Sequence, residues 1–74
     1  MDLQEIYTKV KLLIYILEIH EYFDYSKMLK NALYYGITSG EILDNMEVCL
    51  KIIKKNKLFR KDCLEILKNI KKIK

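Results

Sequence analysis

Apolar residues recur three or four positions apart through residues 3–23, the spacing that keeps one face of an α-helix apolar. A second apolar stripe runs beside the first and leaves only a narrow polar sector. Such a helix is either a membrane span or a core helix with neighbours on several sides. The unbroken apolar run, Leu12–Leu17, is far shorter than the about 20 residues of a span, so we expect a buried central helix. The first stripe is Leu3, Ile6, Val10, Leu13 and Leu17, and the second is Leu12, Ile16, Ile19 and Phe23.

A second helix is expected between Asp24, which is placed to cap it, and Gly36. Gly36 follows the last residue of the apolar periodicity and suits the left-handed conformation in which many helices end. The inner face of this helix should consist of Tyr25, Met28, Leu29, Ala32, Leu33 and Tyr35, with Lys27, Lys30 and Tyr34 pointing away.

The clearest local signal is a capping box at residues 38–41. The Thr38 hydroxyl should accept a hydrogen bond from the backbone N–H of Glu41, and the glutamate side chain should reach back. Ile37 and Ile42 stand at the two positions of a hydrophobic staple. A third helix should therefore begin here. Its inner face should be Ile42, Leu43, Met46, Cys49, Leu50 and Ile53.

A fourth amphipathic helix is expected from about Leu58 to Ile73, after the polar residues 54–57. Sustained two-residue alternation and Asn-Gly or Asp-Gly hairpin turns are missing from the sequence, so no sheet is expected. The chain, residues 1–74, should form a single all-α domain. We expect a small antiparallel bundle of four helices around a central first helix, or of three if the third helix runs into the fourth with a kink at Asn56.

The net charge of +4 hides an uneven distribution. Residues 1–48 hold four Lys against eight Asp and Glu, a net charge of −4, whereas residues 49–74 hold ten Lys and Arg against two acids, a net charge of +8. The outer face of the fourth helix could neutralise several nucleic-acid phosphates. The candidate residues for that contact are Lys57, Lys61, Lys68 and Lys72.

Residues 32–42 also resemble a helix-turn-helix in their alanine, glycine and apolar spacing. The charge of the would-be recognition helix argues against this reading. Its Glu41, Asp44 and Glu47 would meet the phosphate field unfavourably in a major groove. We therefore prefer a helical hairpin with a tight turn at Gly36.

Candidate catalytic and metal-binding residues are few. His20 is the only imidazole, and neither a Cys-x-x-Cys pair nor a glycine-rich elbow accompanies it. Cys49 and Cys63 lie on expected inner faces and could be neighbours. The sequence leaves open whether they are bonded, and we favour reduced core cysteines. We expect no enzymatic activity, metal or cofactor.

Tyrosines and acidic residues at the two early turns suggest a protein-binding surface. Tyrosine is enriched at protein interfaces, and an acidic surface would speed the capture of a basic partner. An ordinary solvated surface is the alternative. The candidate partner-binding residues are Glu18, Glu21, Asp24, Tyr34, Glu41, Asp44 and Glu47.

Several segments together resemble the short all-helical immunity proteins of bacterial toxin–immunity pairs. The resemblance covers just over half of the chain and uses the segment Leu17–Tyr22, the pairs at residues 28–29 and 32–34, the Thr38 cap and Glu41. It implies a non-catalytic cytoplasmic protein of bacterial origin that binds and neutralises a toxin or enzyme. The basic carboxyl-terminal region departs from the acidic character of nuclease inhibitors. A phage-encoded inhibitor of a host enzyme would use the same physics.

The alternative function is a small nucleic-acid-binding regulator that uses the basic fourth helix and the turn at Gly36. The chain should not span a membrane, and the acidic Asp2 and Glu5 argue against a signal peptide. Val48 and Ile52 fall outside the inner face of the third helix, where they form a second contact face or an exposed apolar pair. A homodimer would cover them together with the wide apolar arc of the first helix.

Overall fold

A computed structural model describes residues 2–73, and its helices confirm the expected all-α fold. The third and fourth helices are separate, so the four-helix alternative is the correct one. Within residues 2–73 there is no β-strand. The helices are α1 (Leu3–Ile19), α2 (Phe23–Tyr34), α3 (Ser39–Ile53) and α4 (Arg60–Ile73).

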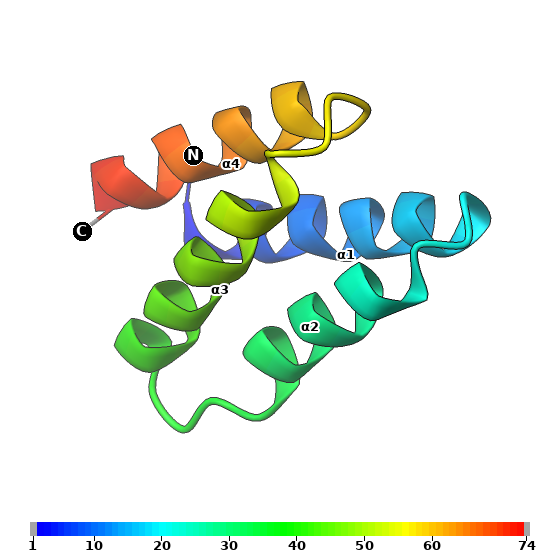
Figure 1. Ribbon diagram of the computed structural model, residues 1–74. Helices are drawn as coiled ribbons and strands as arrows, with labels where there is room; N and C mark the ends of the chain where they lie inside the picture. The colour runs from blue at the N-terminus through cyan, green and yellow to red at the C-terminus, as the bar shows by residue number, and fades with distance from the viewer. Residues whose placement is uncertain (1, 74) are drawn as a thin grey trace.

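The chain reverses direction at each of its three connections, and the helices form a closed cycle of neighbours (Figure 1). α1 packs against α2 and α4, and α3 packs against the same two helices. Among the described residues α1 makes no close backbone approach to α3. α1 therefore has two helices as close backbone neighbours and shares only the side chains of the common core with α3, where the sequence suggested neighbours on more sides.

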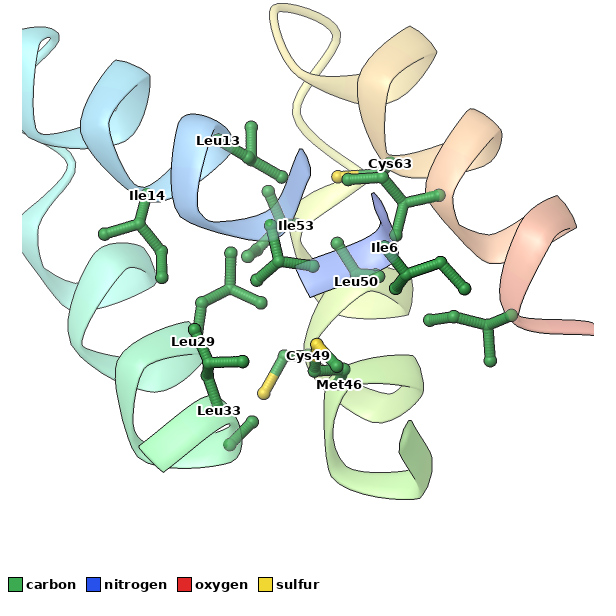
Figure 2. Packing of buried hydrophobic residues seen from close by; sticks show 14 of the residues in the cluster. Ile6, Leu13, Ile14, Leu29, Leu33, Met46, Cys49, Leu50, Ile53 and Cys63 are labelled. Atoms are coloured by element: carbon green, nitrogen blue, oxygen red, sulfur yellow. The ribbon is translucent and has the colours of Figure 1, made fainter. Parts of the chain in front are cut away.

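The interior consists of one apolar cluster to which every helix contributes (Figure 2). Four residues of the first predicted stripe of α1 lie in it, with Ile6, Val10 and Leu17 fully buried, whereas Leu3 is partly buried against it. Fully buried side chains are expected to contribute about 1.5–3 kcal/mol each to folding. The principal contributors from the other helices are Leu29, Leu33, Met46, Leu50, Ile53, Cys63, Ile66 and Ile70.

The second predicted stripe of α1 is largely exposed, and only its Ile16 is half-buried against the core. Leu12, Ile19 and Phe23 are exposed by 58–59%, and Tyr15 between them is exposed by 62%. This part of the prediction was wrong because two neighbouring helices can cover only one side of a helix. α1 therefore keeps an apolar outer face in solvent.

α1 ends at Ile19, four residues earlier than expected, because Glu21 adopts a left-handed conformation with φ 65°. The Glu21 N–H donates to the carbonyl of Glu18 at 3.0 Å, and the Tyr22 N–H donates to the carbonyl of Leu17 at 2.8 Å. These two bonds make a Schellman ending, which usually has glycine at the left-handed position. Phe23 consequently opens α2 and does not extend α1.

The start of α2 also differs from expectation. Tyr22 occupies the N-cap position and forms no side-chain capping bond, whereas Asp24 lies inside the first turn. Its carboxylate still lies near the positive end of the helix macrodipole. Asp24 therefore is not the cap that the sequence suggested.

The turn between α2 and α3 combines one confirmed feature with two corrections. The Glu41 N–H donates to Thr38 Oγ1 at 3.2 Å, as the capping box predicted, and Glu41 Oε2 accepts from the Ile37 N–H at 3.4 Å. The staple is wrong, because Ile37 is exposed by 88%. Gly36 does not have a positive φ. It is needed instead for close approach, since a Cβ there would lie 2.4 Å from Ile42 Cγ1.

Both cysteines are free and buried, which confirms the reduced-core reading. The Cys49 thiol lies 3.6 Å from the carbonyl oxygen of Met28, across the α2–α3 contact. Cys63 is fully buried in α4. Burial, with a smaller effect of the Asp62 charge, raises the pKa of the Cys63 thiol from 9.0 to about 11.

Replacing Gly36 by alanine should destabilise the protein by about 1–3 kcal/mol, because the added methyl group forces Ile42 and the loop apart. Gly40 provides a matched control in the first turn of α3, where an added Cβ meets nothing within 4 Å. Gly40→Ala should stabilise by about 0.5–1 kcal/mol. Urea unfolding of both variants measures the difference. Equal effects of the two substitutions would contradict a close-approach role for Gly36.

The buried Cys63 thiol should make stability fall in alkaline solution. An unfolded thiol loses its proton near pH 9, whereas the folded thiol keeps it until about pH 11. The unfolded state then binds fewer protons, so the free energy of unfolding should fall across this range, by ~2 kcal/mol. In the Cys63→Ala variant the free energy of unfolding should fall less between about pH 8 and about pH 10.5 than in the wild-type protein, as urea unfolding at the two pH values would measure. An identical slope in the variant would show that Cys63 does not contribute.

Candidate functional site

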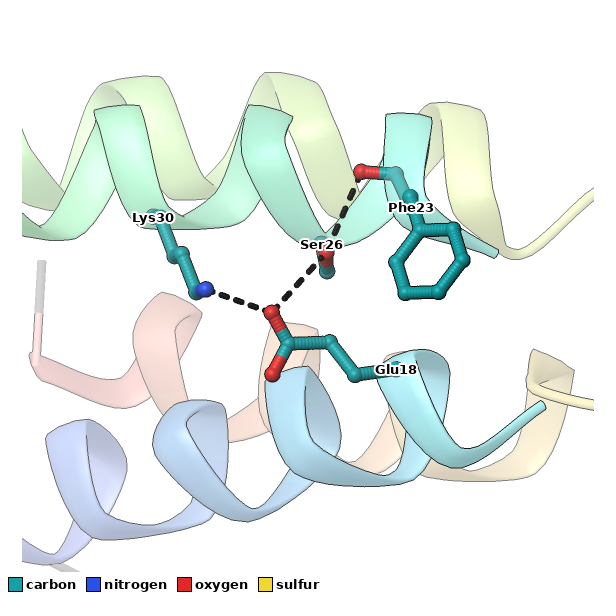
Figure 3. Close-up of polar contacts among 4 residues, drawn as sticks. All are labelled: Glu18, Phe23, Ser26 and Lys30. Carbon is teal, nitrogen blue, oxygen red and sulfur yellow. Dashed lines mark hydrogen bonds and ion pairs between the residues drawn. The ribbon is translucent and has the colours of Figure 1, made fainter. Parts of the chain in front are cut away.

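Glu18, the first of the predicted partner-binding residues, is already engaged within the protein (Figure 3). Its carboxylate forms an ion pair with Lys30 of α2. The hydroxyl of Ser26, which is buried, lies 3.4 Å from Glu18 Oε2 and 3.1 Å from the carbonyl oxygen of Phe23. Glu18 therefore joins α1 to α2 and has little of its charge left for a partner.

Glu21 and Asp24 are exposed at the α1–α2 turn. The tyrosines beside them are not free for contact. Tyr22 stacks on Tyr25 with ring centroids 5.7 Å apart and meets the buried Phe59 edge-on at 5.1 Å. This aromatic cluster holds the α1–α2 turn against the α3–α4 connection. The first pair of tyrosines is therefore structural.

The second pair of tyrosines is arranged differently. Tyr34 and Tyr35 are exposed by 60% and 78%, and Ile37 beside them is the most exposed large apolar side chain among the described residues. The acidic residues nearest in sequence on the outer side of α3 are Glu41 and Asp44, both exposed. We call Tyr34, Tyr35, Ile37, Glu41 and Asp44 the loop surface. Tyr35 and Ile37 were not among the predicted site residues, because the sequence placed Tyr35 on an inner face and Ile37 in a staple.

The backbone under the loop surface is held by several contacts. The capping box binds the start of α3 to the Ile37 backbone, and Ile42 packs directly on Gly36. On the other side, the Tyr35 N–H continues the helical bonding of α2 to the carbonyl of Asn31 at 3.1 Å. The exposed side chains are thus carried on an ordered turn.

The two predicted acidic groups do not form one surface. Glu21 and Asp24 lie at one end of α2, whereas Tyr34, Glu41 and Asp44 lie toward the other end (Figure 1). The helix between them is 12 residues long, about 18 Å. Glu47 lies further along α3 and forms an ion pair with Lys51 at 3.7 Å. An antiparallel bundle was expected to bring the two acidic groups together, but the structure places the first two turns at opposite ends of α2.

The lysines predicted to bind nucleic acid are all exposed. They lie on or just before α4, and none of them forms an ion pair within residues 2–73. Glu65 lies among these lysines on the same side of α4, four residues after Lys61 and three before Lys68. It is bound to Lys9 of α1 at 2.5 Å, a hydrogen bond that lowers the pKa of the Glu65 carboxyl. We call these lysines, Lys57, Lys61, Lys68 and Lys72, the basic face.

His20 has a structural position. It caps the carboxyl end of α1, and its ring meets the edge of Phe59 with centroids 6.0 Å apart. No group of three or more His, Cys, Asp or Glu side chains in the described part of the chain could hold a metal ion. Among helices α1–α4, none is long and apolar enough to cross a membrane.

Comparisons with known proteins add no further constraint. No protein-family model matches the chain, and neither the curated proteins nor the solved structures gave a match. The loop surface and the basic face therefore have to be judged from their geometry alone.

Replacing Glu21 by glycine should stabilise the protein by roughly 0.5–1 kcal/mol. A non-glycine residue pays about 1–2 kcal/mol in the left-handed conformation, and the extra entropy of glycine in the unfolded chain offsets part of this gain. The matched control is Asp24→Gly in the helical first turn of α2, which should destabilise the protein. Thermal unfolding compares the two. A loss of stability in the Glu21 variant would mean that its side chain makes a contact worth more than the strain.

Proposed function

We propose that this protein is a non-catalytic protein-binding module that recognises its partner through the loop surface. The observation that carries the proposal is the exposure of Tyr35 and Ile37, at 78% and 88%, on an ordered turn between two helices. Tyrosine is enriched among the side chains that contribute most of the binding energy at protein interfaces, where the partner buries it. No helix among the described residues covers them, which leaves them accessible to a second protein.

The order of the turn supports this proposal energetically. Association costs free energy for each side chain and loop that must be immobilised. Here the capping box of Thr38 and Glu41 and the packing of Ile42 on Gly36 already hold the backbone. A partner would therefore have to order only the side chains. A preformed loop of this kind favours tight binding for a small contact area.

The charge of the loop surface indicates the character of the partner. Glu41 and Asp44 border the apolar residues and would form the rim of the contact. Rim charges mainly govern the rate and specificity of association. A partner with an apolar pocket surrounded by Lys or Arg would fit this surface.

An inhibitor of the immunity type is the form of this function that we propose. The segments that resemble bacterial immunity proteins include Tyr34, Thr38 and Glu41, which lie in or beside the loop surface. An inhibitor of this kind needs an exposed complementary surface and no reaction centre. A phage-encoded inhibitor of a host enzyme would have the same requirements.

Nucleic-acid binding is the second candidate, and the basic face favours it. Lys61, Lys68 and Lys72 extend over about 16 Å of one side of α4, long enough to contact several phosphates. The same structure argues against the helix-turn-helix form of this function, because Glu41 and Asp44 are exposed at the start of the would-be recognition helix. Any nucleic-acid contact would therefore use α4.

The loop surface can be tested with a partner encoded beside this chain in its source genome. Ile37→Asp and Tyr35→Ala should each weaken binding by about 30-fold or more, as expected of interface anchors, without changing helix content. Val48→Asp is the matched control, because Val48 is also exposed, by 60%, but lies on α3. Isothermal titration calorimetry measures the affinities, and growth during co-expression with the partner measures neutralisation.

Two outcomes would contradict the proposal. Equal binding by the two loop variants and the wild-type protein would exclude the loop surface. Binding to duplex DNA that weakens steeply with salt and is lost on changing Lys61 and Lys68 to glutamate would support the second candidate instead.

A further inference from the structure

The outer face of α1 carries the longest row of exposed apolar side chains among the described residues. Leu12, Tyr15 and Ile19 recur along its outer side, and Phe23 continues the row into α2. Ile16 lies beside them and is half-buried. We call Leu12, Tyr15, Ile16, Ile19 and Phe23 the α1 stripe. It is distinct from the loop surface, which lies at the far end of α2 (Figure 1).

Interhelical ion pairs border the α1 stripe on both sides. Lys9 binds Glu65 of α4 on one side, and Glu18 binds Lys30 of α2 on the other. These pairs join α1 to its neighbouring helices on either side of the stripe. Next to the stripe, a hollow between α1 and α4 is lined by four apolar residues, Leu12, Leu13, Ile16 and Ile66, and by the charged Lys9, Asp62 and Glu65. The hollow could receive an apolar side chain.

The exposed apolar area of the stripe is comparable to that of the patches through which proteins often bind one another. Its four most exposed side chains, at 58–62%, each present about 100 Å² or more, so that together they expose roughly 400–500 Å². The largest apolar patch on a typical monomer is about 300–600 Å² and is often functional. The stripe alone supplies about half of the roughly 800 Å² per partner that a stable interface buries.

Charges at the two ends of the stripe are complementary to each other. Lys11 lies at the end nearer the amino terminus, and Glu21 and Asp24 lie at the other end, whereas Lys9 and Glu18 are already held in ion pairs with Glu65 and Lys30. A second copy turned end for end places its acidic end over the basic end of the first. The same patch then serves on both chains, as a two-fold interface requires. A parallel arrangement would place like charges together.

We propose that two copies of this chain associate through their α1 stripes, with the two α1 helices antiparallel and the two-fold axis near Tyr15 and Ile16. Leu12 of each copy then lies opposite Ile19 of the other. Phe23 of each copy packs against the aliphatic part of the Lys11 side chain of the other copy. The loop surfaces remain exposed, so a dimer could bind two partner molecules, and loss of the dimer would leave the proposed function testable.

Sedimentation equilibrium of the purified protein tests the association. The wild-type protein should have twice the 8.9 kDa mass of the chain at about 100 µM. Tyr15→Glu should reduce this to one chain, because it places two carboxylates together near the axis. Val48→Glu, an equally exposed position on α3, should remain dimeric. A wild-type monomer at all concentrations up to about 1 mM, or a monomeric Val48 variant, would overturn the proposal.

Single cysteines test the antiparallel register. Under mild oxidation Ile16→Cys should form a disulfide-linked dimer, because the two copies of this position meet near the axis. Leu12→Cys should not, whereas the double variant Leu12→Cys/Ile19→Cys should. The native Cys49 and Cys63 are buried and should not compete. Cross-linking of the Leu12 variant as efficient as that of the Ile16 variant would overturn the antiparallel arrangement.

Discussion

Each helix of this protein can bury only one face, and α1 has apolar residues on two. A chain of 74 residues builds a single small core, and its four helices close into a cycle around it. In this cycle α1 is covered by α2 and α4, so Ile6, Val10 and Leu17 are buried while Leu12, Tyr15 and Ile19 remain in solvent. Covering the outer face as well would need another layer of structure. The second apolar face of α1 therefore depends on another molecule for any burial it obtains.

Two short connections determine where the other exposed side chains lie. The left-handed Glu21 ends α1 early and turns the chain so that Tyr22 meets Phe59. At the next turn the close packing of Ile42 on Gly36 fixes the path of the backbone. The residues on either side of Gly36, Tyr35 and Ile37, then face outward. The first turn hides its aromatic side chains, and the second exposes them. This difference in packing, and not tyrosine content, separates a structural turn from a candidate binding surface.

The local periodicity of the sequence was sufficient to identify the helices and most of the core. The inner stripe of α1 and the capping box of Thr38 and Glu41 were confirmed because they depend on residues three or four positions apart. Features that depend on tertiary neighbours were not predictable in this way. Whether Leu12 and Ile19 are buried depends on how many helices cover α1. Whether Ile37 is buried depends on whether Ile42 packs on Ile37 or on Gly36. The pairing of Glu18 with Lys30 likewise required two helices to be placed side by side.

Charge is distributed in space less simply than along the chain. The net acidic residues 1–48 and the net basic residues 49–74 meet at the α1–α4 contact, where Lys9 binds Glu65. In this ion pair the acidic part of the chain supplies the cation and the basic part supplies the anion. The basic face lies on the outer side of α4, and the acidic residues of the loop surface lie on α3, toward the α2–α3 turn (Figure 1). The screening length at physiological salt is about 8 Å, shorter than the helices that separate these regions. Each surface therefore presents its own local charge, so the loop surface keeps a locally acidic character although the whole chain is positively charged.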